Sequence, residues 1–239
     1  GRSMRMGAIV ICEASGKLIE RGRRIASQLL EASPEDIEYA EAVFTVAGTD
    51  RKVTLFEVAK TAIAGGSLPE DLQGRFAEES LIHMPKAVIG SGCHVCEVEV
   101  DPDTGAVDVV DWTAVDDVGR AINPMTLDGQ THGGVMQGIG QALMEDASYD
   151  RETGQMIGAT FIDYAMPRAD TVPAFRTALL EIPTASNPLG VKPGSEGGTA
   201  VAPAAVANAI VDALKEYGVT HIDLPATPER VWRAMGKRS

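Results

Sequence analysis

The residue with the clearest chemical potential in this sequence is Glu196, which lies in the glycine-rich stretch GVKPGSEGGT at positions 190–199. Gly197 and Gly198 follow it, and because glycines have no side chain, a ligand or another backbone can approach the carboxylate closely. A carboxylate at such a site can act as a general base. The same carboxylate can also simply cap a helix, since negative charge is favourable at a helix N-terminus. The residues alone leave both interpretations open.

The stretch after Glu196 predicts a helix with little side-chain volume. Thr199 lies where a helix N-cap is expected, and apolar residues then recur at helical spacing. These residues are Val201, Ala205, Val206, Ala209, Ile210 and Leu214. Because so thin a helix is usually buried on most sides, we expect Glu196 to be poorly solvated at the mouth of a crowded interior.

A second unusual helix is predicted from about Leu127 to Glu145. It contains five glycines, at positions 129, 133, 134, 138 and 140. Each glycine inside a helix costs about 0.5–1 kcal/mol relative to alanine, so close approach of a neighbouring backbone or of a large cofactor must offset the loss. Gln130 and Gln137, seven positions apart, share one face of this helix.

Two other groups of potential ligands are weaker candidates. Cys93 and Cys96 flank His94, but on a strand the two cysteines point to opposite faces, and no second ligand pair follows. Asp116 and Asp117 are likewise neighbours on a predicted strand and should face opposite ways. We therefore expect no metal held by protein ligands at either place.

The 190–199 stretch resembles the active-site loop of the molybdenum hydroxylases, the family of xanthine dehydrogenase, aldehyde oxidoreductase and aerobic carbon monoxide dehydrogenase large subunits. The family's G-V-K-x-x-x-E-G-G-T-like loop carries a catalytic glutamate, which by position is Glu196 here. The resemblance implies that Glu196 takes a proton from a hydroxo or water ligand of molybdenum, whose oxygen then attacks an electrophilic carbon. Pro193-Gly194-Ser195 departs from the glycine-rich sequence that is more common in the family before the glutamate. The identity of the substrate therefore stays open.

Further cofactor contacts are implied by the same resemblance. Gly129-Gln130 matches the family's G-Q pair, whose amide faces the molybdopterin, and Arg2-Ser3 is similar to its G-S-R-S-like turn. Gly197 belongs to the glutamate loop itself. The implied cofactor is molybdopterin with molybdenum, either as such or in its cytosine dinucleotide form, with iron–sulfur clusters and FAD on partner chains only.

The remaining pattern predicts the elements that position these residues. A helix over Ser15–Ala32, a hairpin over 37–46 and a helix over Thr54–Ala64 form one subdomain, residues 1–64. Residues 65–86, rich in glycine, proline and acidic residues, are expected to form a linker or loop. Residues 87–239 form the cofactor-contacting subdomain, with strands expected over 87–100, 106–118, 159–164 and 175–182. The expected fold class is α+β, with mixed sheets, flanking helices and two subdomains of a molybdopterin-binding domain.

Composition limits the classes of partner. The net charge of −13 argues against nucleic acid, and no apolar run is long enough to cross a membrane. Three cysteines fit the reducing cytoplasm and are too few for a four-thiolate iron–sulfur cluster. The chain begins GRSMRMG, without an initiating methionine, so we expect a piece of a longer protein.

The sequence therefore predicts the C-terminal portion of a molybdenum-dependent hydroxylase or dehydrogenase large subunit, inactive alone. It would oxidise a substrate carbon with water-derived oxygen and pass electrons to iron–sulfur and flavin partners. Its other partners are the remainder of the large subunit and a small-molecule substrate: an aldehyde, an N-heterocycle or carbon monoxide. The alternative is a non-catalytic assembly or interaction module, whose two small-residue helices pack against a partner chain while Glu196 is only a cap.

Overall fold

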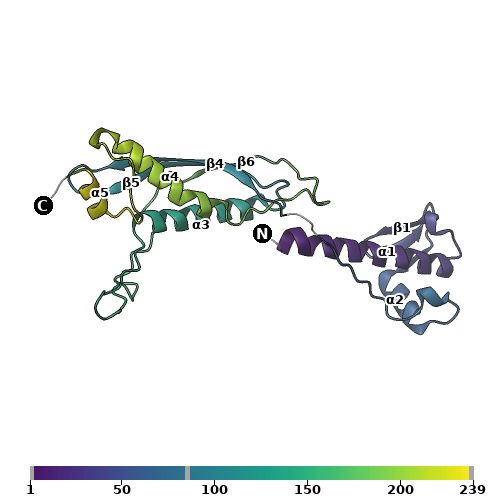
Figure 1. Cartoon of the computed structure of the whole chain (residues 1–239). Helices are drawn as coiled ribbons and strands as arrows, with labels where there is room; N and C mark the ends of the chain where they lie inside the picture. Colours follow the sequence, from purple (N-terminus) through teal and green to yellow (C-terminus); the bar gives the residue numbers. More distant parts are fainter. Residues whose placement is uncertain (1–2, 84–86, 237–239) are drawn as a thin grey trace. The chain divides into compact units, whose positions relative to one another are not determined.

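The computed structural model describes residues 3–83 and 87–236, and the chain divides into two compact units, Arg2–Pro85 and Lys86–Ser239. Figure 1 shows their elements. We call them the N-terminal and C-terminal units and describe each by itself. Among the described residues, no helix is both long and apolar enough to cross a membrane.

The N-terminal unit is built on one long helix and a small sheet. A π-helical turn, η1 (Ser3–Ala8), leads into α1 (Ile9–Leu29), which therefore starts earlier than the predicted Ser15. The strands β1 (Ile37–Ala40), β2 (Val43–Val46) and β3 (Lys52–Thr54) form an antiparallel sheet in that order. The hairpin of β1 and β2 was predicted. The third strand was not, because three residues are too few to show an alternating pattern.

The second helix of this unit, α2 (Leu55–Ala64), is fixed by a reciprocal cap. The Thr54 side chain accepts a hydrogen bond from the Glu57 backbone N–H, and the Glu57 carboxylate accepts one from the Thr54 backbone N–H. The core between the helices and the sheet contains Ile25, Phe44 and Val58, all fully buried. Gly22 of α1 lies against the Phe44 ring, where a methyl group would be 2.5 Å from a ring carbon.

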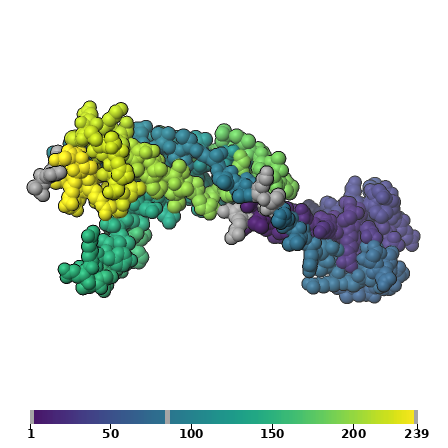
Figure 2. Space-filling view, in the orientation of Figure 1, coloured from purple at the N-terminus to yellow at the C-terminus, as the bar shows by residue number. Residues whose placement is uncertain are grey.

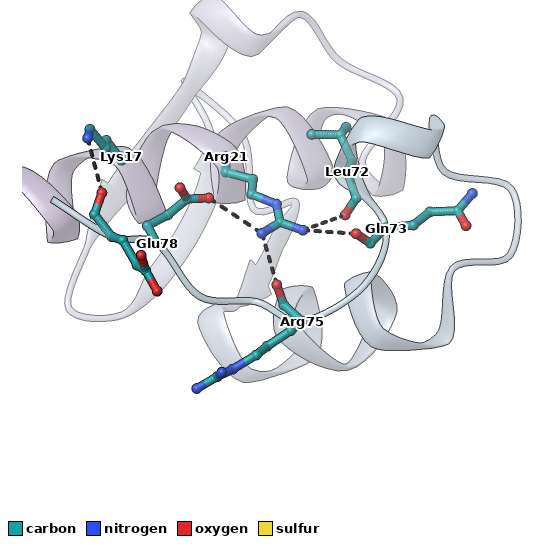
Figure 3. A network of polar contacts seen from close by, with 7 residues as sticks. Lys17, Arg21, Leu72, Gln73, Arg75 and Glu78 are labelled. Atoms are coloured by element: carbon teal, nitrogen blue, oxygen red, sulfur yellow. Dashed lines mark hydrogen bonds and ion pairs between the residues drawn. The ribbon is translucent and has the colours of Figure 1, made fainter.

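Within the predicted linker or loop, residues 65–86, the stretch 68–80 lies against α1 and its core, and residues 84–86 lie outside the described residues. Leu68 and Leu72, the latter in the short 3₁₀ turn η3 (Glu70–Leu72), belong to the core of the N-terminal unit. Arg21 of α1 donates to the carbonyls of three residues in this segment, at 3.3, 3.1 and 3.0 Å: Leu72, Gln73 and Arg75 (Figure 3). One arginine thus satisfies carbonyls that have no strand partner, and it fastens the segment to the helix.

The C-terminal unit is a three-stranded mixed sheet packed against two helices (Figure 1). Its strands β4 (Ser91–Val100) and β5 (Val107–Asp117) are antiparallel, and β6 (Arg176–Leu179) is parallel to β5, in the order β4-β5-β6. The helices α3 (Pro124–Leu143) and α4 (Gly197–Ala213) share a core with Trp112 of β5. A short 3₁₀ turn, η4 (Lys215–Tyr217), and α5 (Pro228–Ala234) close the unit. The predicted α+β class with mixed sheets is confirmed.

Two local predictions in this unit are wrong. The segment 159–164 forms turns rather than a strand, because the Thr160 carbonyl accepts the backbone N–H groups of Asp163 and Tyr164 at 3.1 and 2.9 Å. Phe161 and Ile162 in it are 87% and 94% exposed, and the surrounding segment stands out from the rest of the unit in Figure 2. The second concerns Thr199, which is not a helix N-cap, since α4 already begins at Gly197.

Candidate active site around Glu196

The close packing of α3 against α4 determines where the turn that contains Glu196, directly before α4, lies. A methyl group on Gly138 of α3 would be 2.6 Å from the Ala202 Cβ, and one on Gly134 would be 3.0 Å from the Thr199 nitrogen. A methyl group on Gly198 would be 2.7 Å from the Thr131 carbonyl oxygen. The two helices therefore meet backbone to backbone at the start of α4, and packing offsets the low helix propensity of these glycines.

Two other glycines of α3 have no such explanation within the described residues. At Gly129 and Gly133, both exposed, a methyl group would have no heavy atom within 4 Å. They lie beside Gln130 and Gln137, and positions 130, 133 and 137 share one helical face. This face is open, so it can accept a group that comes close to the α3 backbone.

The two glutamines bracket the Glu196 turn. Gln130 Nε2 donates to the Ser195 carbonyl oxygen at 2.7 Å, and Gln137 Oε1 accepts from the Thr199 hydroxyl at 3.3 Å. The predicted site residues Gln130, Glu196 and Gly197 are therefore brought together. The helical spacing predicts that Gln137 shares a face with Gln130. Its contact with Thr199 joins residues 62 positions apart, so no local pattern indicates it.

Glu196 occupies the N-cap position of α4, but its side chain does not cap the helix. The carboxylate accepts no hydrogen bond from the first turn of α4, whereas the Glu196 backbone carbonyl accepts the Ala200 N–H at 2.9 Å. The Ser195 hydroxyl donates to the carboxylate, and this hydrogen bond is the largest influence lowering the Glu196 pKa from its ordinary value. The side chain thus favours its ionised form, as a base must.

The solvation of Glu196 differs from the expectation. Glu196 is exposed in this chain rather than poorly solvated. Its neighbours are the reason, since Ser195 and Gly197 have little or no side chain with which to cover it.

A cavity of about 430 Å³ opens beside the glutamate. Its walls are formed by Glu196 together with the residues 88–92, 116–118, 193, 194, 197, 200 and 201. The polar residues among them are Glu196, Asp116, Asp117 and Ser91, and the others have apolar side chains or none. A mainly apolar cavity with a few polar groups is typical of small-molecule sites.

Asp116 and Asp117 face opposite ways, as predicted, and have different partners. Asp116 Oδ1 lies 3.1 Å from His94 Nε2 of β4, whose side chain is fully buried. Asp117 instead pairs with Lys192, in the loop that leads to Glu196. These pairings join residues 22 and 75 positions apart, so no local signal in the sequence indicates them.

The cysteines do not form a metal site. Cys93 is exposed and Cys96 half-buried, on opposite faces of β4, and burial raises the pKa of the Cys96 thiol to about 12. A thiol with so high a pKa stays protonated at neutral pH while no metal is bound. Within residues 3–83 and 87–236, no three histidine, cysteine or carboxylate side chains are grouped in a way that could hold a metal ion.

Comparison with known proteins gives the family. The model of the molybdopterin cofactor-binding domain matches residues 1–173, well over half of the chain. The chain belongs to this family. The chain is also 37% identical to the nicotine 6-hydroxylase large subunit of Paenarthrobacter nicotinovorans, over 88% of the length of this chain. The chain is 31% identical to the carbon monoxide dehydrogenase large chain of Hydrogenophaga pseudoflava, over 98% of the length of this chain.

Solved structures agree with this assignment. The chain superposes on a Cu,Mo-CO dehydrogenase with a TM-score of 0.82 at 28% identity, covering 98% of this chain and 30% of that one. Against quinoline 2-oxidoreductase from Pseudomonas putida 86 the TM-score is 0.79 at 36% identity, covering 94% and 29%. The chain spans 26% and 29% of the two curated relatives above, which is less than a third of their length.

The residues around Glu196 fit a molybdopterin cofactor. An organic cofactor with polar edges and an anionic group needs amide donors and close access to backbone, rather than a cage of metal ligands. The open face at Gly129 and Gly133, the two glutamine amides and the start of α4 supply these features.

The predicted contacts near the N-terminus are not tested by this geometry. Ser3 is exposed at the start of η1 and belongs to the N-terminal unit, whereas Arg2 lies outside the described residues. Both stay predictions of the family resemblance.

Proposed function

We propose that this chain is the C-terminal portion of the large subunit of a molybdenum-dependent hydroxylase or dehydrogenase, and that Glu196 is its catalytic base. The observation that supports the proposal is the position of Glu196 between two glutamine contacts, with its carboxylate beside a cavity and not capping α4. A residue that served only as a cap would use its carboxylate on the first-turn N–H groups.

Four residues of the C-terminal unit hold the cofactor in this proposal. Gln130 binds it through its side-chain amide, with Gln137 on the same face, while Gly129 and Gly197 let it approach the backbone of α3 and α4. Arg2 and Ser3 remain cofactor contacts implied by the family resemblance alone. The cofactor, when bound, supplies the metal and the two-electron redox chemistry. Its form, plain or cytosine dinucleotide, belongs to the same proposal.

Glu196 moves the proton in this reaction. The carboxylate accepts it from the water-derived oxygen that attacks the substrate carbon. A lowered pKa keeps Glu196 ionised before the reaction, and exclusion of water in the complete protein would raise its basicity to match the task. The Ser195 hydroxyl, which donates to the carboxylate, fixes its direction.

Electrons then leave through partner chains that carry iron–sulfur and flavin groups. Three cysteines cannot supply four thiolates, and Cys96 stays protonated, so this chain holds no four-thiolate cluster of its own. The substrate is an aldehyde, an N-heterocycle or carbon monoxide, and the cytoplasm is the proposed location.

Co-expression tests the proposal. The chain alone should purify with little molybdenum, since it supplies only part of the cofactor shell, and its absorption spectrum should show no flavin or iron–sulfur bands. Co-expression with the preceding portion of the large subunit should give a complex with molybdenum near stoichiometry by elemental analysis. A stable complex that contains no molybdenum or pterin would instead identify an assembly module and overturn the proposal.

A further inference from the structure

The Asp117 carboxylate joins three segments of the C-terminal unit. Its side chain is only 8% exposed, and its Oδ1 accepts the backbone N–H groups of Gly119 and Ile182 at 2.9 and 3.2 Å. Its Oδ2 accepts from Lys192 Nζ at 2.5 Å. One buried charge therefore links the end of β5, the chain after β6 and the loop that leads to Glu196.

Lys192 is held at its backbone as well as at its side chain. Its N–H donates to the Val118 carbonyl at 2.8 Å, next to the residue that pairs with its ammonium group. The preceding residue, Val191, exchanges two hydrogen bonds with the buried Asn187 side chain, at 2.9 and 3.2 Å. Lys192 is therefore held by hydrogen bonds of both its backbone and its side chain, four positions before Glu196.

The chain between Lys192 and Glu196 has little freedom to move independently. A methyl group on Gly194 would lie 2.8 Å from side-chain carbons of Val118 and Leu127, so this backbone passes tightly over α3 and the residue that follows β5. Gln130 then holds the Ser195 carbonyl at 2.7 Å. A displacement of Lys192 is therefore passed along three residues to the glutamate.

We propose that the Asp117–Lys192 ion pair positions Glu196. The pair holds Lys192, in the loop that leads to Glu196, and thereby fixes where the carboxylate lies beside the cavity. The catalytic meaning of that place rests on the proposed function, whereas the positioning itself is a property of this chain. Neither residue touches the reacting atoms in this proposal, so both are positioning residues.

The charges of Asp117 and Lys192 favour this positioning role. Burial alone raises the Asp117 pKa, but Lys192 and the two backbone N–H groups together outweigh it and lower the pKa. The carboxylate is thus ionised at neutral pH, and the Lys192 side chain, 15% exposed, is held by a charge-assisted hydrogen bond. Such a bond is roughly twice as strong as a neutral hydrogen bond.

Amide hydrogen exchange of the full chain tests the proposal. The variant Lys192→Met keeps the aliphatic stem and removes the charge, and Lys215→Met, at an exposed lysine of η4, is the matched control. In Lys192→Met the backbone amides at positions 192 and 200 should exchange at least about tenfold faster than in the parent. The exchange rates of the amides in β4 and β5 should change less than about twofold. The control should leave both sets unchanged. Lys192→Arg, which retains the charge, should restore most of the protection.

The competing result is equally defined. If the pair only stabilises the unit as a whole, exchange in β4 and β5 will accelerate by the same factor as in the loop, and the proposal fails. It also fails if the loop amides do not respond. Asp117→Asn combined with Lys192→Met should be no worse than Lys192→Met alone at Lys192 and Ala200, because the two residues act as one unit. Since these readouts need no turnover, they can fail or succeed independently of the role of Glu196.

Discussion

The side-chain amide of Gln130 donates to the carbonyl oxygen of Ser195 at 2.7 Å, which ties the open face of α3 to the residue directly before Glu196. Helix α3 therefore contributes to the site in two ways. Its buried glycines admit α4, and its exposed glutamine fixes the turn at the start of α4. The proposed cofactor face and the proposed base are thus built on one pair of helices.

The glycines of α3 should respond to substitution in opposite ways. Gly138→Val places methyl groups against Ala202, so the C-terminal unit should lose about 1–3 kcal/mol of unfolding free energy. Gly129→Ala meets no atom within 4 Å and should gain about 0.5–1 kcal/mol. Denaturant unfolding followed by tryptophan fluorescence measures both, because the two tryptophans, Trp112 and Trp232, lie in this unit. Equal effects of the two variants would contradict the helix contact described here.

Acid should weaken the C-terminal unit partly through Asp117. Its pKa is lower in the folded chain than the ordinary value, so its contribution to stability is complete above the ordinary range near pH 4. The contribution is lost as pH falls from there through the lowered pKa. Asp117→Asn should therefore reduce stability at pH 7 and flatten the acid dependence. Unfolding curves at pH 7 and below pH 4 provide the test, and a variant with the parent's slope would argue against this sign.

The attachment of residues 72–79 to α1 should depend on Arg21. Lys17 and Glu78 supplement its three carbonyl contacts (Figure 3), and its guanidinium lies 5.7 Å from the centre of the Phe76 ring. Arg21→Met should expose the segment and speed chymotryptic cleavage after Phe76 by about tenfold. Arg23→Met is the control, since Arg23 pairs only with Glu20 on the same helix among its described contacts. Cleavage at the same rate in both variants would show that Arg21 does not hold the segment.

The sequence indicated which residues lie at the candidate site better than it indicated how these residues are held. Glu196 could be singled out because the sequence of its loop, including the glycines, is a local feature. Gln130 could be singled out because it follows Gly129 in a G-Q pair. The start of α4 was missed because Gly197 and Gly198 are poor helix formers. The close approach of Gly198 to the Thr131 carbonyl, a tertiary contact that no local pattern shows, explains why a glycine is needed at this position.

Other failures have the same origin. Residues 159–164 carry strand-forming side chains, but no neighbouring strand pairs with them, and Thr160 closes a turn instead. Asp117 was correctly oriented away from Asp116, yet its pairing with Lys192 depends on how the chain returns 75 residues later. Local patterns predict the elements, whereas the contacts between distant segments decide how the site is held.

The central claim is that Glu196 is a base and not a cap. In the complete enzyme, Glu196→Gln keeps the size and shape of the side chain but removes the proton acceptor. Turnover per molybdenum should then fall by at least about a hundredfold, with folding and molybdenum content near those of the parent. Glu216→Gln, at an exposed glutamate of η4, should leave turnover unchanged. The steady-state rate of the Glu196→Gln enzyme, normalised to molybdenum, decides the matter: a hundredfold loss is the predicted result, and a rate within a few-fold of the parent would contradict it.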